Sequence, residues 1–225
     1  MANTQLSTEF DILYSNISSN QAPGLTEYEK SVFLTYSQKE LVIGLYAGTM
    51  GEYFESSEAL RRYLDSLIKT KKYTKQDIIN NDANISISDN SYFFEKPEDL
   101  AFITMEQLTY KIGNCTKRIN VMPVKQDEYN KVKDNPFRGV TKYKALRIDS
   151  GNGLLEIVSA CDIDSYIIKY LSKPTPIILE NLPKGISIEG KSERTECTLD
   201  SNLYKPLLDR AVAMALATIG ASTNK

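Results

Sequence analysis

The stretch from Gly24 to Gly48, which reads GLTEYEKSVFLTYSQKELVIGLYAG, decides how this chain begins to fold. Thr26 and Glu29 have the spacing of a capping box, in which a threonine oxygen accepts from a backbone N–H one turn on and a glutamate bonds back to the cap. Gly48 is the residue type that commonly ends a helix. The stretch contains no group suited to catalysis, so we expect its role to lie in packing and presentation.

A second capping pair, Thr35 and Gln38, follows the first within the same stretch. Two start signals in succession predict that a short helix ends at Leu34 and that another begins there, so we expect the chain to bend at this point. The second helix carries apolar residues at helical spacing, together with Gln38. These positions are Leu34, Gln38, Leu41, Val42, Leu45 and Tyr46.

Helical spacing also appears on both sides of this stretch and at the end of the chain. An apolar stripe over residues 6–17 predicts a first helix, and residues 57–69 predict a third, with Ser57 as its cap. The last helix, over 203–219, is apolar on nearly every side in its middle, which predicts burial on all sides, either within the fold or between it and a neighbour. Its two stripes are Leu203, Leu207, Ala211, Met214 and Ala215, and Leu208, Val212, Leu216 and Ile219.

Between these helices the apolar residues alternate with polar ones, as in strands. Residues 126–133 predict a short helix over the sheet, and Ser150–Gly153 predicts a hairpin turn. The expected strands are 85–87, 101–105, 118–124, 143–148, 154–158, 164–168 and 176–179, followed by a last hairpin over 186–199.

This order of elements predicts an α+β fold. We expect the N- and C-terminal helices to pack together and a mostly antiparallel β lobe, sandwich or barrel-like, to be inserted between them. The expected parts are an N-terminal helical part over residues 1–82, a β-rich lobe over 83–200, and a C-terminal helix over 201–225 that packs back on the helical part.

The composition argues against most enzyme classes. The 225 residues include no histidine, which removes the usual general base and the commonest metal ligand. Cys115, Cys161 and Cys197 are far apart and form no CxxC pair, so we expect three reduced thiols and no zinc site. The net charge of −2 gives no strongly basic nucleic-acid footprint. We also expect no cofactor, no metal and no membrane span.

Residues 185–192 match the phosphate-loop pattern GxxxxGK[ST], with Lys191 and Ser192 in the last two positions. A working phosphate loop needs a buried strand before it and a helix directly after it. Here the interior ISIE alternates like a strand and the following residues are polar and strand-like. We therefore interpret 189–192 as a hairpin turn, and a nucleotide hydrolase built on this loop is the alternative function.

Two further groups of charged residues have a structural and a functional interpretation. Asp149, Asp162 and Asp164 could gather around a divalent cation, but solvated carboxylates at strand ends are the preferred interpretation. A basic run on and after the third helix is best explained as a solvated face with a lysine-rich exit. Its members are Arg61, Arg62, Lys69, Lys71, Lys72 and Lys75.

The segment Asn135–Gly139, NPFRG, combines a rigid turn, an aromatic residue and an arginine. Pro136 fixes the turn, Phe137 can anchor a contact, and Arg138 can reach carboxylates or carbonyls, which is the composition of an interface hot spot. The alternative, equally open, is a loop whose phenylalanine tucks into the core of its own chain.

Several short segments, spread from residue 9 to the last helix, have a distinctive order, although no single one is specific by itself. The segments are EFDILY at 9–14, the stretch 24–48, FE at 54–55, RRYL at 61–64, NPFRG at 135–139, YIIKYLSKPTP at 166–176, TECTL at 195–199 and LDRAV at 208–212. In this order they resemble a neck or tail ring protein of the crAss-like bacteriophages.

The resemblance implies a non-enzymatic virion protein, made in the host cytoplasm, that forms a ring in the neck or tail between portal and tail. It implies as partners further copies in a twelvefold ring, the portal protein and other neck or tail ring proteins. It also suggests that Arg61, Arg62, Lys71 and Lys72 face genomic DNA in the channel. An assembly adaptor absent from the finished particle is a second alternative. The interface candidates are Pro136, Phe137, Arg138, Leu208, Val212, Met214 and Leu216.

Overall fold

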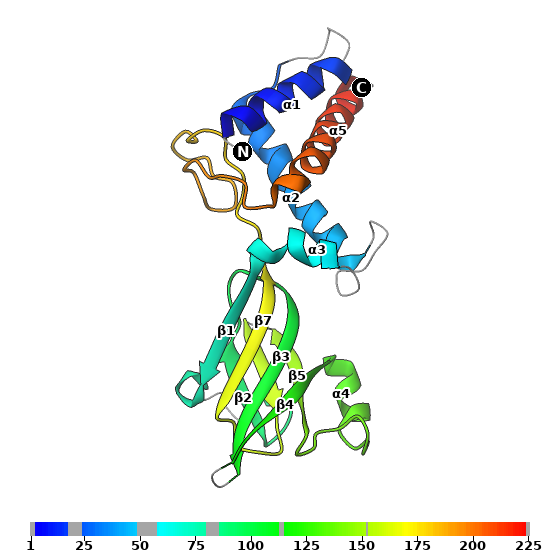
Figure 1. Ribbon diagram of the computed structural model, residues 1–225, viewed down its shortest axis with the longest axis vertical. Helices are drawn as coiled ribbons and strands as arrows, with labels where there is room; N and C mark the ends of the chain where they lie inside the picture. The colour runs from blue at the N-terminus through cyan, green and yellow to red at the C-terminus, as the bar shows by residue number, and fades with distance from the viewer. Residues whose placement is uncertain are drawn as a thin grey trace. The chain divides into compact units, whose positions relative to one another are not determined.

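The computed structural model describes residues 3–17, 24–48, 58–79, 86–112, 115–151 and 153–223. The chain divides into two compact units. The helical unit comprises residues 1–67 and 173–225, and the β unit comprises Ile68–Ser172 (Figure 1). The prediction of an α+β fold, with terminal helices packed together and a β lobe inserted in the chain, is confirmed.

The helical unit is built around one long helix. Its helices are α1 (Asn3–Ile17), α2 (Glu27–Ala47), α3 (Glu58–Tyr63) and α5 (Tyr204–Thr223), with short 3-10 turns η1 (Asp65–Leu67) and η3 (Ser201–Leu203). Helix α2 starts with the predicted capping box: the backbone N–H of Glu29 donates to the Thr26 hydroxyl, and the Glu29 carboxylate accepts from the Thr26 N–H. Gly48 ends it in the left-handed region, at φ 72°.

The predicted bend at Leu34 is wrong, because α2 is continuous from Glu27 to Ala47. The polar side chains that suggested a second start have other uses. The Thr35 hydroxyl accepts from the backbone N–H of Ile177 at 3.1 Å and donates to its carbonyl at 3.2 Å. One turn earlier, the Ser31 hydroxyl accepts from the N–H of Leu179 at 3.0 Å. Helix α2 thus provides hydrogen bonds to Ile177 and Leu179, which lie in an extended segment and, among the described residues, have no strand beside them.

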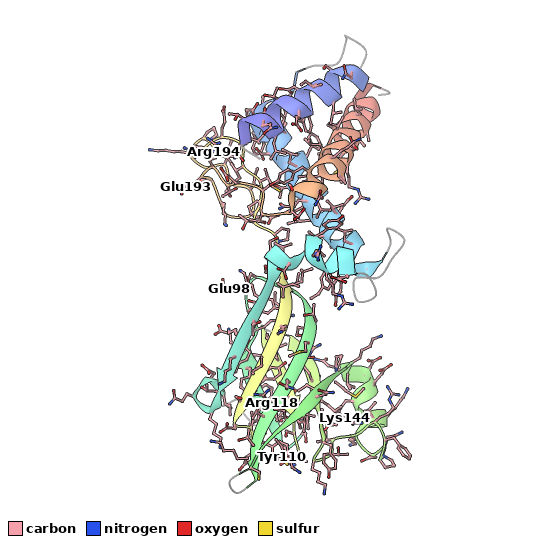
Figure 2. All side chains as sticks on the ribbon, viewed as in Figure 1. Glu98, Tyr110, Arg118, Lys144, Glu193 and Arg194 are labelled. Carbon is pink, nitrogen blue, oxygen red and sulfur yellow. The ribbon has the colours of Figure 1, made fainter. Side chains whose placement is uncertain are left out.

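That extended segment belongs to the long connection over residues 173–200. It contains no helix or named strand, only isolated bridges between Ile178 and Thr195 and between Ile188 and Lys191. The Asn3 side chain donates to the carbonyls of both Ile178 and Thr195, at 2.8 and 3.0 Å, which ties the connection to α1. Figure 2 shows Glu193 and Arg194 pointing away from this connection. The predicted strand over 176–179 and hairpin over 186–199 are therefore wrong as regular structure.

Helix α5 packs on α1 and α2 with both of its predicted stripes. Leu207 and Ala211 of one stripe and Leu208 and Val212 of the other are buried. Within the chain Ala213 and Ala217 remain exposed, so burial of this helix on all sides by its own fold is wrong, and burial against a neighbour stays a prediction. The Ser37 hydroxyl on α2 donates to the carbonyl of Leu207 at 2.7 Å, which fixes the two helices against each other.

Gln38 is the exception within this packing. Its side chain is fully buried, and neither its amide nitrogen nor its amide oxygen has a hydrogen-bond partner among the residues that the structure describes. A buried polar group without a partner costs about 1–3 kcal/mol. The residue that the sequence placed in a second capping box is therefore a source of instability in the helical core.

The β unit is a single curled sheet of seven strands in the order β1-β7-β3-β4-β5-β6-β2. Neighbouring strands are antiparallel except β4 and β5, which are parallel. The strands are β1 (Ile68–Thr74), β2 (Ser91–Glu95), β3 (Leu100–Ile112), β4 (Cys115–Val124), β5 (Lys144–Gly151), β6 (Leu154–Val158) and β7 (Ser165–Ser172), with a 3-10 turn η2 at Lys75–Asp77.

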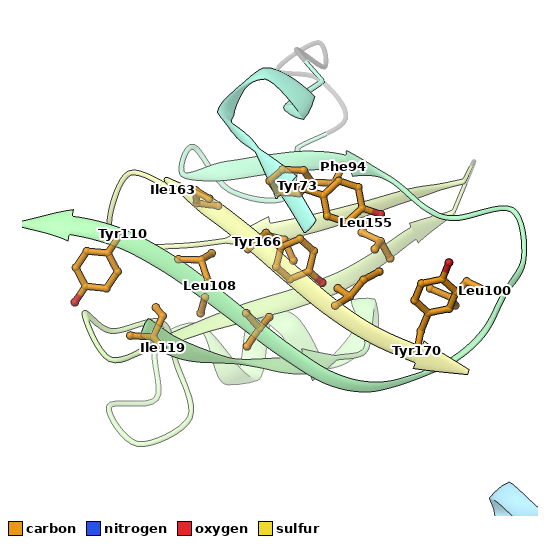
Figure 3. Packing of buried hydrophobic residues seen from close by; sticks show 14 residues of the cluster. Tyr73, Phe94, Leu100, Leu108, Tyr110, Ile119, Leu155, Ile163, Tyr166 and Tyr170 are labelled. Atoms are coloured by element: carbon orange, nitrogen blue, oxygen red, sulfur yellow. The ribbon is translucent and has the colours of Figure 1, made fainter. Parts of the chain in front are cut away.

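The two edge strands of this sheet, β1 and β2, approach each other across its interior. The Tyr73 ring on β1 lies 5.1 Å from the Phe94 ring on β2, and the Tyr166 ring on β7 lies 5.6 and 5.2 Å from the two (Figure 3). The Tyr73 hydroxyl donates to the carbonyl of Glu95 at 2.6 Å. We call this contact between Tyr73, Phe94, Glu95 and Tyr166 the edge seam.

The other face of the sheet is covered by α4 (Gln126–Val132), as predicted. Tyr129 and Val132 on this helix pack on Leu146, Ile148 and Val158. Parallel strands need a crossover connection, and α4 with the loop after it provides the crossover between β4 and β5. The loop that carries Phe137 is thus the last part of this crossover.

Several predicted boundaries in the β unit are wrong. The third helix ends at Tyr63, and residues 68–74, expected to be helical or to follow that helix, form strand β1. Strand β2 was not predicted; the expected strand over 85–87 falls partly outside the described residues, and Ser86 and Ile87 are not in a strand. Ser57 also lies outside the described residues. The predicted hairpin joins β5 to β6, which pair antiparallel.

We predict that the edge seam is needed for the stability of the β unit. Tyr73→Phe removes one hydrogen bond and should lower the free energy of unfolding by about 1 kcal/mol. Tyr73→Ala removes the ring as well and should lower it by about 3–5 kcal/mol. Urea denaturation measures both, with Tyr143→Ala, on an exposed tyrosine, as control. A Tyr73→Ala variant as stable as the wild type would contradict the role of the seam.

We also predict that Gln38→Met stabilises the helical unit. Methionine is similar in size and has no polar hydrogen to satisfy, so the free energy of unfolding should rise by about 1 kcal/mol. Gln5→Met, at an exposed glutamine on α1, is the matched control and should change little. A loss of stability in Gln38→Met would mean that the buried amide has a partner.

Candidate functional site

The segment Asn135–Gly139 forms a loop held by its own hydrogen bonds. The Asn135 side-chain oxygen accepts from the backbone N–H groups of Phe137 and Arg138, at 2.9 and 3.1 Å. The N–H of Gly139 donates to the carbonyl of Asn135 at 2.7 Å. The side chain of Lys144, at the start of β5, donates to the carbonyl of Phe137. These bonds fix the tip of the loop.

Gly139 is required by this packing. A Cβ at this position would lie 2.5 Å from the carbonyl oxygen of Lys133 and 2.7 Å from that of Asn135. Both atoms belong to the backbone and cannot move aside cheaply, so only glycine fits. The loop is therefore held in one conformation, with its first and last residues, Asn135 and Gly139, hydrogen-bonded to each other.

At the tip of this loop the Phe137 side chain is 88% exposed. Of the two interpretations that the sequence left open, the one in which Phe137 tucks into its own core is therefore wrong. A large aromatic side chain held in water by a fixed loop is the kind of feature that anchors protein contacts. Pro136 and Arg138 beside it are also exposed. We call Pro136, Phe137 and Arg138 the anchor loop.

The anchor loop lies in a basic part of the chain. Residues 115–147 contain nine Lys and Arg against three Asp and Glu, whereas the whole chain has a net charge of −2. Arg118 on β4 and Lys144 at the start of β5 lie in this region, on neighbouring strands (Figure 2). The ammonium groups of Lys117 and Lys142 lie 5.7 and 5.2 Å from the centre of the exposed Tyr143 ring. Because its basic residues are spread over two strands, a helix and a loop, this region is less conspicuous in the sequence than the short basic run over residues 61–75.

The residues predicted to face DNA are divided between the two units of the chain. Arg61 and Arg62 are exposed on α3 of the helical unit, and Arg62 lies 3.7 Å from Glu58. Lys71 and Lys72 are on β1, where successive side chains point to opposite faces. The Lys71 ammonium lies 4.8 Å from the centre of the Tyr73 ring, and Lys72 is exposed.

The interface residues predicted on α5 divide into two groups. Leu208 and Val212 are buried within the helical unit. Met214 and Leu216 are half-buried. Leu208 also forms the floor of a groove of about 390 Å³ between α1 and the start of α5. Ile12, Leu13 and Tyr204 line its apolar walls, and Glu9, Lys205 and Asp209 lie around it. We call this the α1–α5 groove.

The GxxxxGK[ST] match forms a tight turn. Ile188 and Lys191 exchange backbone hydrogen bonds of 2.9 and 3.0 Å across Glu189 and Gly190. Both turn residues have positive φ, 53° and 77°, as in the turns that join hairpin strands. Residues 193–200, all of them described, contain no helix, so no helix N-terminus faces the loop. The Glu189 carboxylate pairs with Lys39 on α2. This arrangement lacks the geometry that holds a phosphate.

The three aspartates that could have gathered around a cation are each paired separately. Asp149 lies 3.2 Å from the Lys96 ammonium, and Asp164 lies 3.3 Å from that of Lys111. Asp162 accepts from the Tyr92 hydroxyl at 3.1 Å. Among the described residues no group of three or more acidic, cysteine or histidine side chains could hold a metal ion. Cys115, Cys161 and Cys197 are free thiols.

The buried acidic groups of the β unit serve its packing. Glu106 on β3 lies 2.9 Å from the Arg147 guanidinium and accepts from the Tyr166 hydroxyl. Burial, and then the charge of Glu106, raises the pKa of Tyr166 far above its ordinary value, so this hydroxyl stays a donor. Glu156 accepts from the N–H of Ile87, at 2.9 Å, and from the hydroxyls of Ser91 and Ser150. Both carboxylates have their partners within the unit.

Comparison with known proteins gives a consistent result over the whole chain. A family model described as phage tail ring protein 3/4 matches residues 1–225. Ring protein 3 of Bacteroides phage crAss001 is 39% identical over 223 residues, which are 96% of this chain and 95% of that protein. Ring protein 4/5 of the same phage is 33% identical over 225 residues, covering 95% of this chain and 91% of the other. Within the described residues, every helix is too short or too polar to cross a membrane.

We predict that Lys191 binds no nucleotide. Lys191→Ala should leave the circular dichroism spectrum and the thermal unfolding curve unchanged, because the side chain is exposed and the turn is formed by Glu189 and Gly190. Lys184→Ala, at an exposed lysine outside the turn, is the control. Titration with ATP and GTP tests nucleotide binding directly. Micromolar binding that Lys191→Ala abolishes and Lys184→Ala does not would overturn this interpretation.

Proposed function

The chain belongs to the phage tail ring protein 3/4 family, and on this premise we propose that it is a structural subunit of a ring in the neck or tail of a crAss-like phage particle. By the resemblance, the ring lies between portal and tail and surrounds the channel through which DNA passes. Its partners are further copies of the chain, twelve to a ring by the same resemblance, together with the portal protein and other ring proteins.

The observation that carries this proposal is the anchor loop. Phe137 is 88% exposed although its loop is fixed by Asn135, Gly139 and Lys144. A loop that is already fixed has less conformational freedom to lose on binding, so less binding free energy is spent on ordering it. Such a loop suits a protein whose role is to be held at a defined place in an assembly.

The function then follows from geometry. When one surface of a subunit contacts a different surface of the next, the contact repeats, and it closes into a ring if the rotation between subunits is a simple fraction of a full turn. The helical unit and the β unit each contribute a surface of distinct chemistry: a groove with apolar walls and a loop set in basic surroundings. A head-to-tail contact of this kind requires two unlike surfaces on one chain.

For the DNA that passes through the ring we keep Arg61, Arg62 and Lys72 as candidates, because their charged ends are exposed. Lys71 is a weaker candidate, because its ammonium lies over the Tyr73 ring. Contacts of this kind would be made to phosphates and would not read the base sequence.

The protein acts without catalysis in this proposal. The nucleotide hydrolase that the GxxxxGK[ST] match suggested has little support, because residues 188–191 form a tight turn with no helix after it. The second alternative, an adaptor that leaves before the particle is finished, differs from a ring subunit in one observable respect, namely its absence from purified particles.

We predict that the purified chain forms closed rings, either alone or on addition of the neighbouring portal or ring protein. Mass photometry and electron microscopy of stained particles should show one cyclic oligomer, and mass spectrometry of purified phage should find the chain in many copies per particle. A chain that stays monomeric under all these conditions and is absent from particles would be an adaptor. Detection in particles without any ring would also contradict the proposal.

A further inference from the structure

The anchor loop and the α1–α5 groove are complementary in chemistry. The loop offers an exposed aromatic ring followed by an exposed arginine. The groove offers apolar walls, where Ile12 is 53% exposed, with the carboxylates of Glu9 and Asp209 beside them. Its volume of about 390 Å³ lies at the lower end of the range of 300–1,000 Å³ that is typical of binding pockets. An aromatic side chain is an occupant of suitable size and polarity.

Each of these two surfaces carries a charged residue that is available for pairing. Neither Arg138 nor Asp209 forms an ion pair with any residue that the structure describes. A guanidinium is well suited to bind a carboxylate through two parallel hydrogen bonds. With Phe137 in the groove, the adjacent Arg138 would be close to the groove's carboxylates.

We infer that the anchor loop of one copy of this chain docks into the α1–α5 groove of a second copy, with Phe137 between Ile12 and Leu208 and Arg138 paired with Asp209. This inference rests on the proposed function, because it identifies the contact that closes the ring. The loop and the groove are different surfaces, so each copy can give its loop to one neighbour and receive the loop of another, and a contact made in this way propagates from copy to copy.

Charge complementarity favours a second copy as the occupant of the groove. The β unit, residues 68–172, has sixteen basic and fourteen acidic residues, which gives +2, and residues 115–147, which include the loop, have nine basic and three acidic residues, which gives +6. The helical unit, residues 1–67 and 173–225, has eleven basic and fifteen acidic residues, which gives −4. Opposite potentials steer two copies so that the β unit of one meets the helical unit of the other, and like surfaces repel. Among the described residues that line the groove, Lys205 is the only basic one. It lies on helix α5, as Asp209 does.

The first test is a charge exchange at the proposed pair. Phe137→Ala, Arg138→Glu and Asp209→Arg should each weaken assembly by about tenfold or more, as expected for hot-spot residues. Arg138→Glu combined with Asp209→Arg in one chain should restore assembly. Tyr36→Ala removes another exposed aromatic side chain, on α2, and is the matched control, which should assemble like the wild type. Mass photometry over a concentration series measures every variant.

The second test shows that the contact is made between copies. Phe137→Ala chains keep an intact groove, and Ile12→Arg chains keep an intact loop. Neither should assemble alone, but a mixture should form dimers that stop at one contact and never close a ring. Ile12 is half-exposed, so arginine there should not unfold the helix, and circular dichroism checks this.

The outcomes separate this inference from the proposed function. If the wild type forms rings and the loop and groove variants form them equally well, the docking is wrong and the ring proposal stands. If the single charge variants fail and the combined variant also fails, the loop contacts another surface and the pairing is wrong. If Arg138→Glu leaves assembly unchanged but abolishes binding to duplex DNA or to a second ring protein, the loop serves that partner. A wild type that forms no ring under any condition overturns both proposals.

Discussion

The β unit depends on the contact between the two edges of its own sheet. An open sheet presents a row of unpaired N–H and C=O groups on each edge strand, which invites other chains to add to it. Here β1 and β2 face each other through Tyr73 and Phe94, with Tyr166 against both rings and the Tyr73 hydroxyl on the carbonyl of Glu95. The curl that results leaves the crossover between β4 and β5 on the other face, where α4 and the anchor loop can be presented without weakening the interior.

The helical unit contains a long connection without regular structure, over residues 173–200. Buried backbone groups need hydrogen bonds, and residues 173–200 have few neighbouring strands to supply them. Ser31 and Thr35, one turn apart on α2, bond to the backbone of Leu179 and Ile177, and Asn3 bonds to two carbonyls of the same connection. Short polar side chains thus replace a strand, which allows Ile177, Ile178 and Leu179 to be buried.

The same contacts explain which parts of the fold the sequence could predict. The capping box at Thr26, the end at Gly48 and the strand over 154–158 were predicted correctly, and the helix predicted over 126–133 is found over 126–132; all of them have strong signals in the local sequence. Thr35 was misinterpreted because its partner lies 142 residues away. Strand β1 was missed because its lysine-rich sequence pairs only with the distant β7. The exposure of Phe137 depends on how Gly139 packs, and the α1–α5 groove joins opposite ends of the chain, so neither could be read from local pattern.

The β unit enters and leaves the chain at one place. Ile68, its first residue, pairs with Leu171 across neighbouring strands, so the entry at β1 and the exit at β7 lie side by side. Every hydrogen bond described above for the helical unit is made within that unit. A segment whose two ends are adjacent can be exchanged for another with a different surface, while the helical unit keeps its own hydrogen bonds. Related chains could thereby diversify what they dock to by replacing 68–172 as a block.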